Sequence, residues 1–462
     1  MGLMLVFVLI IITAMVLNYI TQKDFISPTF LGLSSFFITS VLVILNAENW
    51  MVDVSLLFFF TILIAMASLI TGTYFIRRRR PHYSANSEKF HRNNSKKHYP
   101  TSTRKYIRKY PSKTILALSL LLFAIFVIYL RDFIFSSGSI SSILRNIYES
   151  GFTSEGGHFL FHQIEKMIVA IGYVSYFHIL NVIFSFDIKR KYKPRRIILS
   201  LIPILISLVT MLIATDRNVV IRFFIYALAL WILFFQRSPK RKLKKSNGII
   251  LSCTIVLVLI MILVFYGLGK IKNYTSNFER MIGIWGGSGL YNFNLYVNEF
   301  DGNYTLGMST FKSLIGVFAS LGFVDSQSII GDAGTVIFVS NNGYIYASNI
   351  HSGFQPFYQD FGIVGVALFT FLMGVFFEFL YQKTYKRYCG FSWVFYAAFL
   401  YPLIYMCIAD QFYARLHLGL LYEVFWLSVF YYITYGRNKV KRVRTKKKKT
   451  ENKVLVYESI SN

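Results

Sequence analysis

The sequence predicts an all-α membrane protein of about eleven transmembrane helices with a large extracytoplasmic loop. Of the 462 residues, 55% are hydrophobic and 15% are charged, whereas a soluble domain carries about a quarter charged residues. Apolar runs of about 20 residues recur along the chain, which is the length that a helix needs to cross the hydrocarbon core. The basic residues gather in a few segments between these runs, as expected for cytoplasmic loops.

Eleven apolar runs are long enough to be spans. The first starts at Leu3 without a preceding basic residue or a following cleavage site, so we expect a retained helix rather than a signal peptide. The predicted spans cover residues 3–20, 29–46, 54–76, 114–130, 166–186, 197–214, 219–235, 248–268, 359–382, 391–409 and 417–435. They divide the chain into eight N-terminal helices within 1–268, a polar loop over 269–358, three helices within 359–435 and a basic tail over 436–462.

Lysine and arginine determine the predicted orientation, because they are enriched on the cytoplasmic side of membrane proteins. With the C-terminal tail inside, the cytoplasmic segments hold 39 of the 49 Lys and Arg residues, and the outer segments hold 8. The basic loop 77–113 and the tail 436–462 then face the cytoplasm, and the N-terminus lies outside. We therefore attribute the net charge of +28 to topology and anionic lipid, and we expect no nucleic-acid partner.

The polar loop 269–358 is the predicted working surface, because irregular backbone at a membrane is placed where water or substrate can satisfy it. Within this loop, residues 308–324 are fairly apolar, but a full span there would reverse the orientation of the basic tail. We expect an interfacial or re-entrant helix instead. The glycine-rich run 285–294 suits a phosphate-binding loop or a close backbone approach, although it matches no nucleotide-binding motif.

Arginines are scarce on the predicted outer side, and each is a candidate phosphate ligand, since a guanidinium meets phosphate oxygens with two parallel hydrogen bonds. Arg217 lies in the short turn before the seventh span, Arg280 lies early in the polar loop, and Arg415 lies between the last two spans. Arg222, about one turn into the seventh span, is either a further ligand or an interface anchor. The alternative for these arginines is a salt bridge with a neighbouring acid, namely Asp216, Glu279 or Asp410.

Other polar residues allow more than one interpretation. His351, the only histidine in the polar loop, is either a hydrogen-bonded structural residue or a sugar ligand and proton acceptor. Asp360 most simply caps the start of the ninth span. Glu378 and Glu423 lie inside spans, where an acid is functional or paired. The three cysteines show no metal-binding spacing, so we expect neither a disulfide framework nor a metal.

Three segments in the second half of the chain carry a family resemblance. They are 286–294 (GGSGLYNFN), 306–311 (LGMSTF) and 349–365 (NIHSGFQPFYQDFGIVG). Together they resemble the oligosaccharide repeat-unit polymerases of bacterial surface polysaccharide, the Wzy-type or O-antigen polymerase family. The layout is similar too, with many spans, a large outer loop in the second half and a basic residue in a short central turn, here Asp216-Arg217. Many members have Tyr-Thr where this chain has Ile350-His351, and this departure leaves the role of His351 open.

The resemblance implies a metal-independent glycosyltransferase of the GT-C-like helical membrane class that uses no cofactor. Its donor is a growing glycan on undecaprenyl diphosphate, and its acceptor is a single lipid-linked repeat unit. The acceptor hydroxyl attacks the anomeric carbon of the donor, and undecaprenyl diphosphate leaves. By this resemblance Arg217 and Arg280 hold the diphosphate with Arg415 as a third ligand, while His351 and Asp360 orient or deprotonate the acceptor. The implied sugar contacts are Tyr291, Asn294, Asn349 and Tyr358.

The implied setting is the plasma or inner membrane, with a chain-length regulator and a flippase as partners beside the lipid-linked oligosaccharides. Two other functions fit the same features. An O-antigen ligase uses the same kind of donor and differs only in its acceptor. A lipid-linked oligosaccharide flippase is a transporter, for which internal repeats are expected, and the sequence shows none.

Overall fold

The helices of the protein were located in a computed structural model. It describes residues 2–22, 24–78, 112–131, 158–184, 193–213, 217–237, 267, 278–325, 336–339, 345–386 and 390–435. The predicted eighth span 248–268 apart from Gly267, nearly all of the basic loop 77–113 and the tail 436–462 lie outside these residues.

Eight helices within the described residues are long and apolar enough to cross a membrane, so the chain is a multi-pass membrane protein. They are α1 (Gly2–Gln22), α2 (Pro28–Leu45), α4 (Leu56–Arg78), α10 (His158–Phe184), α11 (Lys193–Ile213), α12 (Arg217–Arg237), α16 (Phe354–Lys386) and α19 (Leu418–Tyr435). Shorter apolar helices occupy two more predicted spans: α7 (Ser112–Tyr129), and α17 (Phe391–Ala398) followed by α18 (Tyr401–Tyr405). Every predicted span other than the eighth thus coincides with helix, and the total of eleven stays a prediction.

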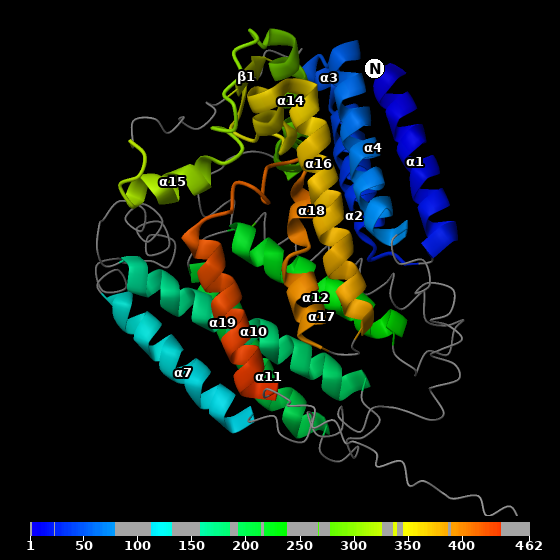
Figure 1. Cartoon of the computed structure of the whole chain (residues 1–462). Coiled ribbons are helices and arrows are strands. Elements are labelled where there is room, and N and C mark those ends of the chain that lie inside the picture. The colour runs from blue at the N-terminus through cyan, green and yellow to red at the C-terminus, as the bar shows by residue number, and fades with distance from the viewer. Residues whose placement is uncertain are drawn as a thin grey trace, which may run out of the picture.

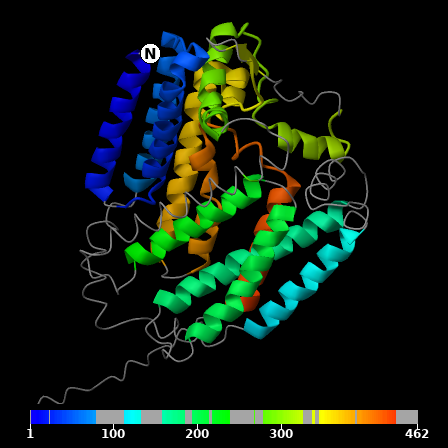
Figure 2. The same cartoon turned by 180° about the vertical axis from the view of Figure 1, so that it is seen from behind.

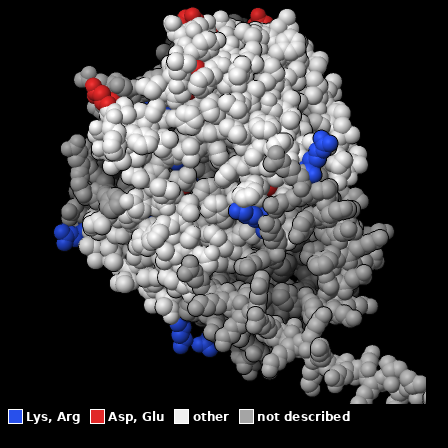
Figure 3. Space-filling view, viewed as in Figure 1, with Lys and Arg blue, Asp and Glu red and all other residues white. Residues whose placement is uncertain are grey.

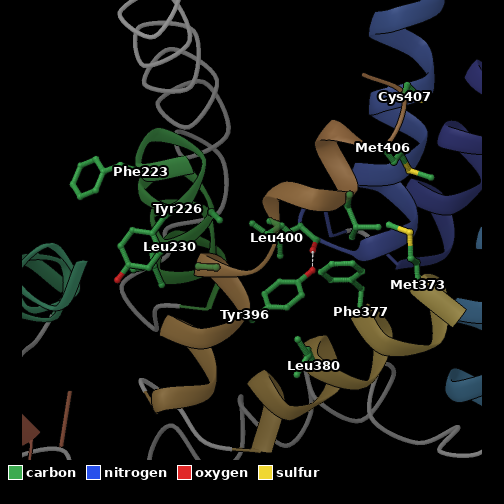
Figure 4. Packing of buried hydrophobic residues seen from close by; sticks show 14 of the residues in the cluster. Phe223, Tyr226, Leu230, Met373, Phe377, Leu380, Tyr396, Leu400, Met406 and Cys407 are labelled. Carbon is green, nitrogen blue, oxygen red and sulfur yellow. Dashed lines mark hydrogen bonds between the residues drawn. The ribbon is translucent and has the colours of Figure 1, made fainter. Parts of the chain in front are cut away.

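The described helices form two groups, which Figures 1 and 2 show from opposite sides. In the first group, α1, α2, α4 and α16 run side by side and α14 (Phe278–Glu299) packs on α2 and α4. In the second group, α7, α11, α12 and α19 pack around α10. The broken helix pair α17–α18 lies between the groups. Figure 4 shows Tyr396 and Leu400 from this pair between Tyr226 and Leu230 of α12 on one side and Phe377 of α16 on the other.

Glycines bring the backbones of α4 and α16 into direct contact in the first group. A methyl group added at Gly72 would stand 2.2 Å from the carbonyl oxygen of Phe371, and one at Gly374 would stand 2.5 Å from the carbonyl oxygen of Leu69. Small residues at such crossings let two membrane helices approach closely and increase their van der Waals contact. This contact matters in lipid, because the hydrophobic effect does not drive helices together there. The two helices therefore form the rigid centre of this group.

The glycine-rich run 285–294 is part of a helix, so the prediction of an irregular polar loop is wrong for this stretch. Its glycines face other segments instead of a ligand. A methyl group at Gly287 would lie 3.3 Å from the backbone carbon of Leu42, and one at Gly289 would lie 2.8 Å from the carbonyl oxygen of Cys407. Of the two interpretations of this run, the geometry favours the close backbone approach.

The remaining part of the predicted loop holds one short helix and a hairpin. Strands β1 (Val336–Val339) and β2 (Ile345–Ser348) pair antiparallel, with Val336 opposite Ser348. Helix α15 (Lys312–Ser320) has nine residues, which is too few to cross a bilayer, and none of them is buried. Its exposed Leu314 and Phe318, with Leu321 just after it, follow a spacing of four and three that puts them on one face. Residues 308–324 thus form a short amphipathic helix and not a full span, as the sequence predicts.

Two predicted spans differ in their detail. Helix α16 starts at Phe354, five residues before the predicted ninth span, and is interrupted at Phe361 and Gly362, where Gly362 has φ of 60° and ψ of −146°. The predicted tenth span is broken between Ala398 and Tyr401. Pro402 lies in the first turn of α18, where its missing N–H costs nothing, whereas a continuous helix would lose a hydrogen bond and clash with the preceding turn.

Charged residues are sparse on the surface and are distributed unevenly. Figure 3 shows an almost entirely uncharged face, with acidic atoms toward the end that carries α14 and β1 and most of the basic atoms lower or at the edges. The uncharged part of this face suits burial in lipid.

Candidate functional site

Two arginines of the second helix group converge on one tyrosine and one glutamate. Arg415 Nη2 donates to Glu423 Oε1 at 2.6 Å, and Arg222 Nη1 lies 3.4 Å from both carboxylate oxygens of Glu423. Arg415 Nη1 also donates to the hydroxyl of Tyr401. The guanidinium carbons of Arg222 and Arg415 lie 5.4 Å and 5.5 Å from the centre of the Tyr401 ring, within cation–π range. Arg222 and three residues of the segment 401–423 thus form one charged centre.

A third cation and a histidine border this centre. A methyl group added at Gly419 would stand 3.4 Å from Lys166 Nζ and 2.5 Å from Cε1 of the His417 ring, so both side chains lie beside the start of α19. Lys166 Nζ is also 5.8 Å from the centre of the Tyr422 ring. We define the cationic cluster by these side chains: Lys166, Arg222, Tyr401, Arg415, His417 and Glu423.

The cationic cluster is largely shielded from solvent. The side chains of Arg222 and Arg415 are 12% and 13% exposed, while that of Glu423 is 31% exposed. Within the described part of the structure, Arg222 and Arg415 meet the carboxylate of Glu423, and Glu165 lies close enough to Lys166 to act on its charge. Cationic groups at a poorly hydrated position attract an anion strongly. Figure 3 shows a recess on this face with basic atoms at its floor.

His417 responds to the surrounding charge. Burial lowers its pKa below the usual value, and Arg415, Lys166 and Arg222 lower it further, with Glu423 acting in the opposite direction. The imidazole is therefore neutral at pH 7. Because its Nδ1 accepts a hydrogen bond from the backbone N–H of Gly419 at 2.9 Å, the ring proton sits on Nε2. His417 can thus donate one hydrogen bond from Nε2 to an anion. A proton taken up when that anion binds goes to Nδ1 and replaces the hydrogen bond from Gly419.

Asp410 stabilises the loop that contains Arg415. Its carboxylate accepts hydrogen bonds from the backbone N–H groups of Phe412, Tyr413 and Ala414 at 2.9–3.0 Å. The Asp410 carboxylate oxygens bond backbone groups, and the acid that pairs with Arg415 is Glu423. The expected alternative of an Arg415–Asp410 salt bridge is therefore wrong.

The other two predicted diphosphate ligands occupy comparable positions in their helices. Arg217 is the first residue of α12, and Arg280 lies in the first turn of α14. Their side chains, together with Asp216 and the side chain of Glu279, lie outside the described part of the structure. A role for Arg217 and Arg280 in diphosphate binding stays a prediction.

His351 and Asp360 lie in the segment that begins α16. His351 is half-buried, and its Nδ1 lies 3.1 Å from Oε1 of Gln355. Asp360 is fully buried and accepts from the backbone N–H groups of Ser309 and Thr310 at 3.0 Å and 2.7 Å, and from the hydroxyl of Thr305. The prediction that Asp360 caps the start of its own helix is wrong, since α16 begins six residues earlier and the carboxylate binds another segment.

Three of the four predicted sugar contacts are buried. Tyr291 donates to the carbonyl of Trp50 at 2.8 Å, and Asn294 donates to the carbonyl of Asp53 at 2.7 Å. Tyr358 is 6% exposed, with its ring against those of Phe293, Tyr296 and Phe300. Asn349 is exposed. Of the four, Asn349 alone is open to a ligand in this conformation, and sugar contact by the other three stays an untested prediction.

The sequence reasoning identified part of the cationic cluster and missed the rest. Arg415 was predicted as a ligand, Arg222 as a ligand or an anchor, and Glu423 as functional or paired. Tyr401, Lys166 and His417 were not predicted as site residues. The sequence did contain one indication of Lys166. Lys166 and Arg222 are the two basic residues at the outer ends of predicted spans, so they are expected at a similar depth in the membrane.

The fold and the cationic cluster define the class of the protein: a helical multi-pass membrane protein with paired and clustered charged side chains between its helices. Comparisons with protein-family models, with curated proteins and with solved structures gave no match. Among the described residues, no group of three or more His, Cys, Asp or Glu side chains could hold a metal ion.

Proposed function

We propose that the protein joins lipid-linked oligosaccharide repeat units, and that the cationic cluster holds the diphosphate of the polyprenyl carrier. The observation that carries the proposal is the convergence of Arg222 and Arg415 on Tyr401 and Glu423, beside Lys166. Charged groups in a membrane-spanning bundle are costly to place there, and they mark ion or substrate sites by default.

The chemistry of the cluster suits a diphosphate in particular. Guanidinium groups present parallel N–H donors at the spacing of phosphate oxygens, and burial strengthens each of these contacts. A neutral or monoanionic ligand would not balance the surplus charge of the cluster. A lipid-linked diphosphate brings several negative charges and an apolar chain, and both parts suit a cationic centre within a helical bundle.

The reaction follows from the same charges. The acceptor hydroxyl forms a bond to the anomeric carbon of the donor glycan while the bond from that carbon to the diphosphate oxygen breaks. The bonding electrons leave with the diphosphate, and prepositioned arginines stabilise this developing charge. The hydroxyl proton passes to a base. Of the two predicted bases, His351 is favoured, because the carboxylate of Asp360 already accepts three hydrogen bonds.

The proposed setting is the plasma or inner membrane, with the N-terminus outside, the C-terminus in the cytoplasm and the cluster toward the outer leaflet. The supporting observations are the excess of basic residues in the predicted inner segments and the uneven charge in Figure 3. A chain-length regulator and a flippase are the proposed partners.

Deletion of the gene followed by sizing of the surface glycan tests the proposal. Single repeat units on lipid carrier are expected for a polymerase. Long chains that stay unattached would indicate an O-antigen ligase, and units retained on the inner leaflet would indicate a flippase. In the same assay, Arg217→Ala and Arg280→Ala are expected to abolish polymer at normal protein levels. Wild-type chain lengths in both would remove these two arginines from the diphosphate site.

A further inference from the structure

Glu423 is the acidic residue that Arg222 and Arg415 share, and its side chain is more exposed to solvent than either arginine. Its side chain is 31% exposed, more than twice the exposure of either arginine. Of the three side chains in these ion pairs, that of Glu423 is therefore the most accessible.

The remaining hydrogen bonds of the two arginines point to the surrounding protein. Arg415 Nη1 donates to the Tyr401 hydroxyl, and Arg222 Nε donates to the carbonyl of Asn218 at 3.2 Å. These bonds fix the guanidinium planes without using the donors that face Glu423. Among the contacts that the structure describes, those to Glu423 link both arginines to one acidic side chain, and its two oxygens on one carbon resemble two oxygens of a phosphate group.

We propose that Glu423 is a resident counter-ion, which holds the two arginines in place in the empty site and is displaced by the phosphate groups of the ligand. This inference rests on the proposed function, because it concerns the same site and names how that site selects its ligand. Glu423 is a positioning residue here and takes no part in bond formation.

Displacement makes the site selective for multiply charged anions. A monoanion that replaces the carboxylate exchanges one negative charge for another and gains nothing in Coulomb energy. A diphosphate supplies additional negative charge, which Lys166 and the protonation of His417 can balance. The counter-ion thus excludes weakly charged anions while it prevents repulsion between the two arginines.

Binding of small anions to the purified full-length protein in phosphatidylcholine nanodiscs tests the proposal. The probes are inorganic pyrophosphate and dimethyl phosphate, a monoanion with the same oxygen chemistry. Wild type is expected to bind pyrophosphate and not dimethyl phosphate. In Glu423→Gln, pyrophosphate is expected to bind at least about tenfold tighter, because a competing unit charge is removed, and dimethyl phosphate binding is expected to appear.

The matched control is Glu165→Gln. Glu165 is a buried acid whose Oε2 lies 3.3 Å from Nδ1 of His162, and it also acts on the charge of Lys166. It shows whether the loss of another acid near the cluster has the same effect as the loss of the acid that the two arginines share. Its substitution is expected to leave the preference for pyrophosphate unchanged. A thermal unfolding curve of each variant shows that it is folded, and pyrophosphate should raise the midpoint of Glu423→Gln more than that of wild type.

Two outcomes overturn different conclusions. If Glu423→Gln is folded and binds pyrophosphate equally well or more weakly, the role of Glu423 is only structural and the counter-ion proposal is wrong. If Arg222→Gln and Arg415→Gln also leave pyrophosphate binding unchanged, the cationic cluster is not the anion site, and its part in the proposed function fails as well.

Discussion

The two helix groups handle polar side chains in opposite ways. In the first group, Tyr291 and Asn294 are buried, and each is satisfied by a nearby backbone carbonyl. In the second group, Arg222 and Arg415 are held close together with a single carboxylate between them. The comparison teaches that a polar stretch of sequence can be structural, whereas a concentration of unbalanced charge in a membrane protein requires a ligand or a partner to explain it.

The largest expected effect concerns the rigidity of the first group. In Gly374→Ala the new methyl group would stand 2.5 Å from the carbonyl oxygen of Leu69, so α4 and α16 must separate. We expect little folded protein, measured by fluorescence-detected size exclusion. Gly316→Ala is the control, because a methyl group there meets no atom within 4 Å. Equal recovery of the two variants would mean that α4 and α16 can separate enough to accept the methyl group, and that their contact is not rigid.

The next effect concerns the charges of the second group. Arg222→Gln and Arg415→Gln are each expected to reduce polymer formation by about 100-fold or more, the effect typical of removing a donor to a developing oxyanion. Protein levels should stay normal, and exposed Arg131→Gln serves as the control. Polymer of normal length and amount in both cluster variants would place the active centre elsewhere.

A smaller effect separates structural from ligand-binding roles in the first group. Asn294→Ala removes the bonds to Asp53 and to the backbone N–H of Ser55 and leaves buried groups unsatisfied, which costs about 1–3 kcal/mol. We expect a lower thermal midpoint with unchanged pyrophosphate binding and unchanged KM for the lipid-linked acceptor. A raised KM without loss of stability would restore the sugar-contact prediction for Asn294.

The smallest effect is a pH dependence of anion binding. The pKa of His417 is depressed in the empty site by burial and by Arg415, Lys166 and Arg222, and Glu423 opposes this. A bound anion raises the pKa, so binding takes up a proton and becomes stronger as the pH falls below neutral. In His417→Gln this part of the pH dependence should disappear, as measured by pyrophosphate titrations at several pH values. Identical profiles would show that His417 does not contact the anion.

The sequence predicted the membrane helices well because their signal is local. Long apolar runs identify spans, and ten of the predicted ones coincide with described helices. The site was harder to predict, because Lys166, Arg222, Tyr401 and Glu423 come together only through the packing of α10, α12, α18 and α19. The spacing of these residues along the chain does not predict that they are in contact.

The glycine-rich run shows a different limit. Its composition is equally compatible with a ligand-binding loop and with close helix packing. The choice depends on what faces Gly287 and Gly289, namely the backbone near Leu42 and Cys407, and those partners lie more than 100 residues away. Composition alone cannot supply that information.

The interruption between α17 and α18 restricts how a long isoprenoid tail can travel. Backbone groups left open by a broken helix cannot face hydrocarbon, so Leu400 and Tyr401 must stay enclosed by protein, and they are 1% and 5% exposed. At this point of the seam between the two helix groups, the described residues leave no path for a lipid chain. Under the proposed function, the tail of a carrier whose headgroup binds Arg222 and Arg415 therefore does not pass between Leu400 and Tyr401.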